Sequence, residues 1–337
     1  MIGKSQDDMP RLSIPNSASI HTLKSFLSTN NPFCDHCTPA VLGLHPSWAH
    51  MDPMALAMAA AWGGWCRRHD LPVQVENIVG QHTNYAARMK LFQHLDVGYD
   101  AGLEEHEEAG RFLPLSQIRT QEDLRSVIAN VSALLHLDNE PDGLAAVQYC
   151  VSELIRNVLE HSGSTEGAYV CAQRYLKKNP KRVSIAVADC GSGISQHLGR
   201  SYPAALKDGL EALRLAMQPG ITGARKDMYG TPDNAGAGLF ITRAIAKATG
   251  GYFALLSGDA AFRLMRSRQR VGRTLYWDAF EDKRSNKWRF SAPVWQGTVA
   301  AVEIATEEIP DFHGFFQWIR KQLPAKKKTS VGKIKFT

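Results

Sequence analysis

The stretch that decides the fold is Cys150-Val151-Ser152-Glu153-Leu154-Ile155-Arg156-Asn157-Val158-Leu159-Glu160-His161. Apolar residues in and just before it recur at helical spacing, which predicts an amphipathic helix. This apolar stripe consists of Val147, Val151, Leu154 and Val158. Glu153, Asn157 and His161 stand four residues apart and share a different face of the same helix. A polar face of this kind is often only solvated, so the stretch by itself assigns no function.

The residue types on this polar face suit a site for a hydrated metal ion and a water molecule. Mg²⁺ keeps most of its waters and takes only one or two protein oxygens, which Asn157 could supply. Glu153 could orient or deprotonate a water for attack on a phosphate. Asn157 is therefore a candidate metal ligand, and Glu153 is a candidate general base.

Two glycine-containing stretches follow downstream. Residues 183–194 read VSIAVADCGSGI, a β-rich run that ends in Asp189, Gly191 and Gly193. Such glycines let the backbone approach a ligand closely, and the carboxylate can accept a hydrogen bond from an exocyclic amine. Residues 234–239 read NAGAGL and lead directly into a helical pattern. Glycines at a helix start expose unpaired N–H groups, which suits a polyphosphate.

These stretches together resemble the ATPase superfamily of gyrase, histidine kinases and MutL, known as the GHKL or Bergerat fold. The order Glu-x-x-x-Asn, Asp-x-Gly-x-Gly and Gly-x-Gly-Leu is similar to the N box and two glycine boxes of that family. Residues 296–302, QGTVAAV, look like its closing Gly-Thr strand. The resemblance covers about residues 140–305, and four boxes in order are far more specific than any one of them.

The resemblance implies an ATP site that uses Mg²⁺ as cofactor. Asp189 would bind the adenine amino group, with Thr298 nearby through a water. Asn157 would ligate Mg²⁺, and Glu153 would be the general base. The other residues implied to contact the nucleotide are His161, Gly191, Gly193, Ile194, Gly236, Gly238 and Leu239.

The expected fold class is α/β, in the form of an α+β sandwich. A Bergerat domain with a mixed sheet covered by helices would occupy residues 140–322, after a smaller α/β domain at 39–100. The smaller domain resembles a STAS domain, the fold of anti-anti-sigma factors, with strands at 40–44 and 73–75 and helices at 52–68 and 83–92. Asp52 and Pro53 suit the N-cap and first position of a helix. The phosphorylatable turn of that family usually reads Asp-Ser-Ser-Gly, whereas Asp52-Pro53-Met54-Ala55 carries no hydroxyl, so we expect a structural or docking module.

The remaining segments are expected to be an extension at 1–38, a linker with a helix over 121–135 at 101–139, and a basic tail at 323–337. An ATP lid would lie between Ile194 and Gly236, with a helix near 204–217 and Arg225 and Lys226 facing phosphates. Residues 261–296 interleave basic and aromatic side chains, a pattern that can bind nucleic acid. The alternative, which we prefer, is a hairpin with one buried aromatic face.

Composition favours a globular chain in a reducing compartment. Apolar residues make up 44% and charged residues 21% of the 337 residues, and the formal net charge is +6. The apolar run 54–65 is too short to span a bilayer, and the start lacks the apolar segment of a signal peptide. Six scattered cysteines predict free thiols, and we interpret Cys34 and Cys37 in the same way rather than as metal ligands. We therefore expect a cytoplasmic protein with no membrane partner.

The expected function is an ATP-driven conformational switch that acts on a protein partner or on a homodimer. One alternative is an anti-sigma-type serine protein kinase that acts on a separate STAS partner. Another is a nucleotide sensor that does not hydrolyse ATP, and a last one is a nucleic-acid-binding regulator. The first three differ in the product formed from ATP, and the last would show steep salt dependence of nucleic-acid binding.

Overall fold

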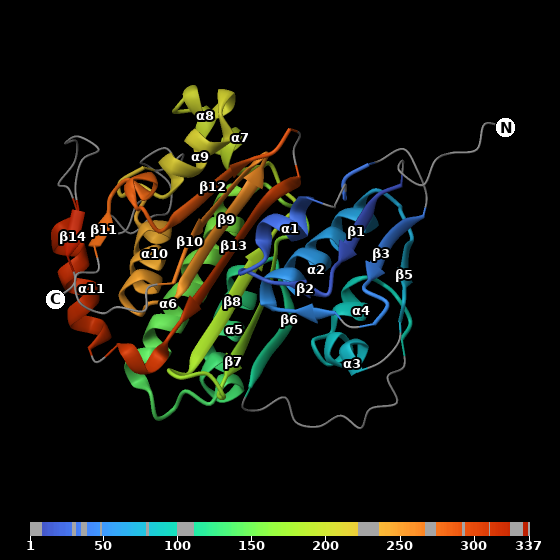
Figure 1. The fold of residues 1–337 in the computed structure, drawn as a ribbon, viewed down its shortest axis with the longest axis horizontal. Coiled ribbons are helices and arrows are strands. Elements are labelled where there is room, and N and C mark those ends of the chain that lie inside the picture. Colours follow the sequence, from blue (N-terminus) through green and yellow to red (C-terminus); the bar gives the residue numbers. More distant parts are fainter. Residues whose placement is uncertain are drawn as a thin grey trace.

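The structure is a computed structural model with mixed α/β architecture. It describes residues 9–28, 32–34, 39–47, 49–78, 81–99, 111–221, 236–266, 274–291, 294–309, 311–323 and 333–335. A small unit lies beside a larger sheet, with further helices on the far side of that sheet (Figure 1). No helix in these ranges is both long enough and apolar enough to cross a membrane.

A seven-stranded sheet forms the centre of the larger unit. Its strand order is β12-β10-β9-β13-β8-β7-β6, and each neighbouring pair is antiparallel. The expectation of a mixed sheet is therefore wrong. Short turns join β7 to β8 and β9 to β10, and strands joined in this way must run in opposite directions. The strands are β6 Phe112–Ile118, β7 Ala168–Tyr175, β8 Arg182–Ala188, β9 Tyr252–Gly258, β10 Ala260–Leu264, β12 Ser285–Arg289 and β13 Trp295–Ile304.

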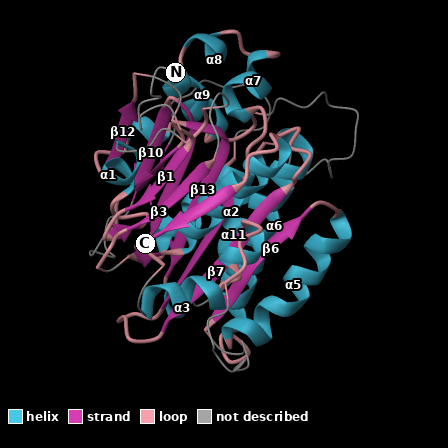
Figure 2. Ribbon diagram, turned by 90° about the vertical axis from the view of Figure 1, so that its right-hand side faces the viewer, coloured by secondary structure: helices cyan, strands magenta, loops and turns pink. Residues whose placement is uncertain are grey.

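Helices cover one face of this sheet. They are α5 Gln121–Leu135, α6 Pro141–His161 and α10 Gly238–Ala248, and α11 Phe312–Gln322 packs on α6. Figure 2 shows α5 on the outer flank, next to β6. The apolar stripe of α6 is buried, as predicted, against Val and Ile side chains of β7, β8 and β13. The predicted helix over 121–135 is confirmed, and it starts with a capping box formed by Thr120 and Asp123.

The small unit contains a parallel sheet of order β1-β3-β5, with β1 Arg11–Ile14, β3 Ala40–Leu44 and β5 Val73–Glu76. Because β1 pairs with β3, residues 11–14 belong to this unit, and the boundary expected at residue 39 lies too late in the chain. A second pair joins β2 Ser17–Ala18 to β4 His50–Met51, and α1 Leu23–Ser28 follows β2. The predicted helix start is confirmed, since the Asp52 carboxylate accepts a hydrogen bond from the amide of Ala55 at 3.1 Å at the start of α2 Pro53–Arg68.

Helix α2 lies against the other face of the large sheet, between the two sheets (Figure 1). It is buried continuously from Pro53 to Cys66, because apolar surfaces surround it. The strands present small side chains to it, such as Cys171 and Ala186, so the helix can approach closely. A Cβ added at Gly64 would lie 2.4 Å from the hydroxyl oxygen of Tyr169 in β7. The two units therefore share one continuous core.

Several expected segments differ in detail. The helix expected at 83–92 is two helices, α3 Gln81–Arg88 and α4 Leu91–His94, because Lys90 adopts a left-handed conformation with φ of 62°. The helix expected at 204–217 is also divided, into α8 Ala204–Lys207 and α9 Gly209–Ala216, and Asp208 between them is extended and caps α9. The expected linker contributes β6 to the large sheet, while its residues 101–110 lie outside the described residues.

The region 261–296 forms an antiparallel pair of β10 with β12, as preferred from the sequence. The expectation of a single buried aromatic face is wrong, because Trp277 and Phe280 pack partly buried against one core cluster and Trp288 and Phe290 against another. Between these strands lie β11 Thr274–Tyr276 and the short 3-10 helix η2 Ala279–Glu281. Part of the basic tail forms a strand, β14 Lys333–Lys335, that pairs with β11. The 3-10 helix η3 Thr306–Glu308 follows β13.

Candidate functional site

Asp189 lies directly after β8 and is fully buried. Its Oδ1 accepts a hydrogen bond from the amide of Gly191 at 2.7 Å, and its own amide donates to the carbonyl of Thr298 at 2.9 Å. Its Oδ2 is buried and has no hydrogen-bond partner among the described residues. Burial raises the pKa of this carboxyl from 3.8 to about 7. The site therefore contains a fixed carboxyl group with one free acceptor.

Two glycines allow the backbone to pack closely around this carboxyl group. Gly193 and Gly297 have φ of 77° and 88°, in the region that favours glycine. A Cβ on Gly297 would lie 2.3 Å from the Asp189 carbonyl oxygen, and one on Gly193 would lie 2.8 Å from Oγ of Ser257. Ser257 connects both glycine turns, because its hydroxyl accepts from the amide of Ile194 at 3.0 Å and donates to the carbonyl of Gly297 at 2.7 Å. The loop after β8 and the start of β13 are therefore packed closely together.

The polar face of α6 lies against the second glycine stretch. Glu153 is only 8% exposed, and its Oε1 accepts a hydrogen bond from Arg156 at 3.0 Å. A Cβ added at Gly238, the first residue of α10, would lie 2.3 Å from Oε2 of Glu153. Burial raises the pKa of Glu153, and the positive charge of Arg156 opposes that shift. The carboxylate therefore lies against the start of α10, and a side chain in place of Gly238 would displace it.

The C-terminal end of α6 contacts the loop that follows β8. The carbonyl of Ser162 accepts a hydrogen bond from the amide of Ser192 at 2.7 Å. The ring of His161 lies 4.4 Å from the ring of His197, which belongs to α7 Gly193–Gly199. Burial lowers the pKa of His197 to about 4, so both facing rings can be close without two positive charges.

The surroundings of Asn157 show whether the residues present suit Mg²⁺. Its Nδ2 is buried and has no hydrogen-bond partner among the described residues. The nitrogen and oxygen of an amide exchange places by a flip, so the free position can equally present the oxygen. Within the described part of the chain, no group of three or more His, Cys, Asp or Glu could hold a metal ion. One amide oxygen fits an ion that takes its other ligands from water and phosphate.

Gly236, at which the expected lid ends, pairs with Gly220 within that lid. Gly220 and Gly236 have φ of 80° and 78°, and the amide of Gly220 donates to the carbonyl of Gly236 at 2.9 Å. A Cβ on Gly236 would lie 2.5 Å from the carbonyl oxygen of Ile221. Residues 222–235, which include Arg225 and Lys226, lie outside the described residues.

The structure brings predicted site residues together in two groups: Asp189, Gly191, Gly193 and Thr298 around the loop after β8, and Glu153 with Gly238 at the start of α10. Leu239 is an exception, because it packs partly buried against the core and offers only an apolar contact. Thr298 contacts Asp189 through its backbone carbonyl. Sequence reasoning missed Ser257, which no motif marks, and Trp295, whose Nε1 donates to the Asp189 carbonyl at 3.0 Å. Trp295 directly precedes the Gly-Thr stretch, and that position was the only available signal.

In comparisons with known proteins, no family model, no curated protein and no solved structure matches the chain. What the molecule does must therefore be inferred from the positions and chemistry of its own side chains. The relevant features are a buried carboxyl group with one free oxygen, a set of close glycine turns and a glutamate at a helix start.

Proposed function

We propose that the protein binds ATP with Mg²⁺ in the manner of a GHKL ATPase. The observation that carries the proposal is the free Oδ2 of Asp189, which is fully buried and held beside glycine turns. A buried acceptor without a partner costs free energy, commonly about 1–3 kcal/mol, so its retention favours a ligand that donates to it. The exocyclic amine of adenine is such a donor.

The other residues have roles consistent with this orientation. Asn157 would hold Mg²⁺ through its amide oxygen, and the ion when bound would neutralise phosphate charge and orient the phosphates. The backbone N–H groups at the start of α10 would face the phosphates, beside Gly238. Glu153 would orient the attacking water or accept a proton from it, and burial raises the pKa of this carboxyl, which makes it a stronger base.

The output that fits best is a conformational change. Gly220 within the expected lid and Gly236 at its end both have positive φ, a conformation that glycine adopts without strain. A lid that closes on ATP would change the surface presented to a protein partner or a second copy of the chain.

The kinase alternative requires an acceptor on a separate protein. The only acidic or hydroxyl group in the turn before α2 is Asp52, and its carboxylate is buried and accepts from the amides of Ile20 and Ala55. Burial raises the pKa of Asp52 to about 6. A buried helix cap is a poor phosphate acceptor, so we expect no phosphate on residues 40–100 of this chain.

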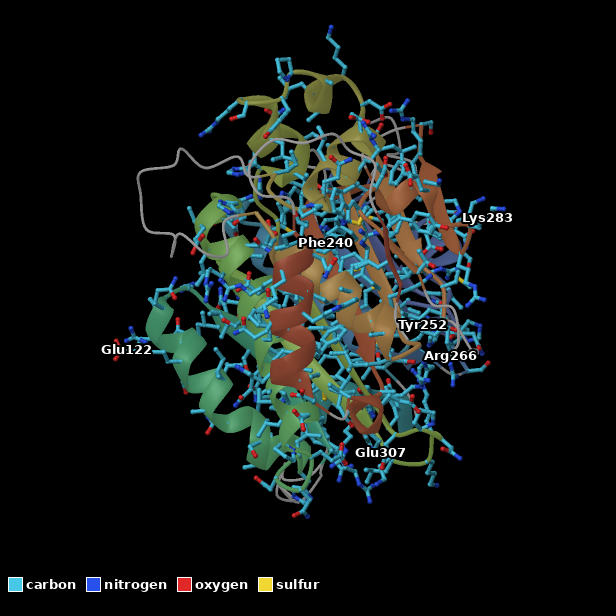
Figure 3. The ribbon with its side chains drawn as sticks, turned by 90° about the vertical axis from the view of Figure 1, so that its left-hand side faces the viewer. Glu122, Phe240, Tyr252, Arg266, Lys283 and Glu307 are labelled. Carbon is cyan, nitrogen blue, oxygen red and sulfur yellow. The ribbon has the colours of Figure 1, made fainter. Side chains whose placement is uncertain are left out.

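The nucleic-acid alternative has weaker support from the basic insertion. Several of its described cations are engaged within the protein: Arg263 donates to the carbonyl of Ile20, Lys287 donates to that of Phe280, and Arg289 pairs with Asp208. Figure 3 shows Lys283 and Arg266 on the flank opposite Glu122 of α5. Arg268, Arg270 and Arg273 lie outside the described residues.

Incubation with γ-labelled ATP and Mg²⁺, with and without candidate partners, tests the proposal. An ATPase gives free phosphate, a kinase gives labelled partner, and a sensor gives bound but intact ATP. Absence of any ATP binding, measured by calorimetry under the same conditions, would overturn the proposal.

A further inference from the structure

We infer that the small N-terminal unit sets the orientation of the adenine-recognition loop, with Trp65 and Arg68 as positioning residues. This inference rests on the proposed function. Both residues belong to the last turn of α2, the helix that lies between the two sheets. Neither residue would touch the nucleotide, and both act through the peptide unit that follows Asp189.

The peptide between Cys190 and Gly191 is held from two sides. On one side, its N–H donates to Oδ1 of Asp189 at 2.7 Å. On the other side, its C=O accepts from Nη2 of Arg68 at 3.4 Å and from Nε2 of Gln296 at 3.5 Å. A peptide unit is planar, so whatever fixes the direction of the C=O also fixes the direction of the N–H.

Trp65 supports the same peptide through Gln296. The indole Nε1 of Trp65 donates to Oε1 of Gln296 at 3.1 Å, which leaves the amide nitrogen of Gln296 pointing to the Cys190 carbonyl. Phe33 packs edge-on against Trp65 and Trp295, with ring centroids 5.2 Å and 5.1 Å apart. Trp295 in turn donates to the Asp189 carbonyl. The aromatic side chains of the two units therefore form one support behind the loop.

The thiol of Cys190 adds a direct contact to the middle of α2. It donates to the carbonyl of Ala61 at 3.3 Å and is buried.

The fixed direction of the Cys190–Gly191 peptide has one consequence for adenine recognition. Oδ1 of Asp189 stays turned toward the Gly191 amide only while that peptide keeps its direction, and Oδ2 then remains the acceptor for the ligand. Releasing the Cys190 carbonyl would allow the carboxyl group to rotate.

The test compares ATP with inosine triphosphate, which carries a carbonyl oxygen where adenine carries its amine. The variant is Trp65→Phe combined with Arg68→Met, which keeps an aromatic ring at 65 and an unbranched side chain at 68 but removes both donors. The control is Arg67→Met, because Arg67 crosses the same interface to Glu166 and Tyr169 without contacting the loop. Affinities and turnover are measured by calorimetry and phosphate release, and stability by thermal unfolding.

We expect the parent to prefer ATP and the double variant to bind ATP about 5-fold more weakly, with inosine triphosphate affinity unchanged and turnover at saturating ATP retained. The control should keep the parent preference. An equal preference in parent and double variant would overturn the inference and leave the proposed function intact. A parent that shows no preference for ATP would instead overturn the adenine assignment itself, and the inference with it.

Discussion

At the scale of single residues, the buried carboxyl group of Asp189, which the proposed function requires, lowers the stability of the folded protein at neutral pH. The folded chain holds its proton to a higher pH than the unfolded chain, because burial raises the pKa from 3.8 to about 7. The free energy of unfolding should therefore fall as pH rises from about 4 to about 7 and stay lower above that range, by up to about 4 kcal/mol from this group.

The substitution Asp189→Asn removes this titration and keeps the shape of the side chain. We expect the variant to melt at a higher temperature than the parent at pH 8 and to show a smaller difference between pH 5 and pH 8. Thermal unfolding at the two pH values measures this. A parent whose melting temperature changes with pH no more than that of the variant would show that the carboxyl titrates normally.

A substitution at Glu153 distinguishes a protein that hydrolyses ATP from one that only binds it. Replacing it by glutamine keeps the packing against Gly238 and removes the base, so Glu153→Gln should bind ATP within about 2-fold of the parent and hydrolyse it at least about 10²-fold more slowly. Asn157→Ala serves as the contrast, since loss of the metal ligand should weaken Mg-ATP binding itself. Undiminished hydrolysis by Glu153→Gln in a phosphate-release assay would reduce the glutamate to a structural role.

At the scale of elements, the sequence predicts well what depends on local chemistry. The periodicity of α6, the capping residues of α2 and the helix over 121–135 depend on nearby residues, and the structure has them where expected. The sequence could not show that β1 completes the small sheet or that β6 joins the large one, because strand pairing depends on partners far along the chain.

The residues of the site likewise divide into those that the sequence predicts and those that it does not. The glycines and Asp189 stand out because their residue types are tied to one conformation or one chemistry. Ser257 and Trp65 do not stand out, since a serine in a strand and a tryptophan in an apolar helix look like ordinary core positions. Their roles come from the tertiary contacts that bring β9 and α2 to the loop after β8.

Close packing between α2 and β7 yields a prediction at this scale. A Cβ on Gly64 would lie 2.4 Å from the hydroxyl oxygen of Tyr169 and 3.1 Å from the ring carbon that carries it. Gly64→Ala should therefore destabilise the protein by about 1–3 kcal/mol, despite the better helix propensity of alanine. Denaturant unfolding of Gly64→Ala, Tyr169→Phe and the double variant checks this. The double variant should recover part of the loss, and strictly additive effects would contradict the proposed clash.

At the scale of the whole molecule, the two units share a core that neither can complete alone. Residues of α2 pack on β7 and β8, and Trp295 belongs to the same buried cluster as the strands of the small unit. Loss of the small unit would expose this apolar face to water, which favours aggregation.

We therefore expect the chain to unfold in one cooperative transition. Scanning calorimetry of the full chain should give a single peak, and a chain that starts at residue 111 should be expressed in aggregated form. A control chain truncated only before residue 9 should behave like the parent. Two separated peaks, or a folded monomeric fragment from residue 111, would show that the units are independent.

The central claim is that Asp189 receives the base of ATP, and calorimetric titration with Mg-ATP at pH 8 tests it most directly. Parent and Asp189→Asn are compared under identical conditions, since at this pH the parent carboxyl is ionised and its free oxygen is a full acceptor. The variant presents a donor to the adenine amine if its amide nitrogen takes the place of Oδ2, so its affinity should be at least about 10-fold weaker while its fold is retained. Equal ATP affinity of the parent and the folded variant would contradict the account.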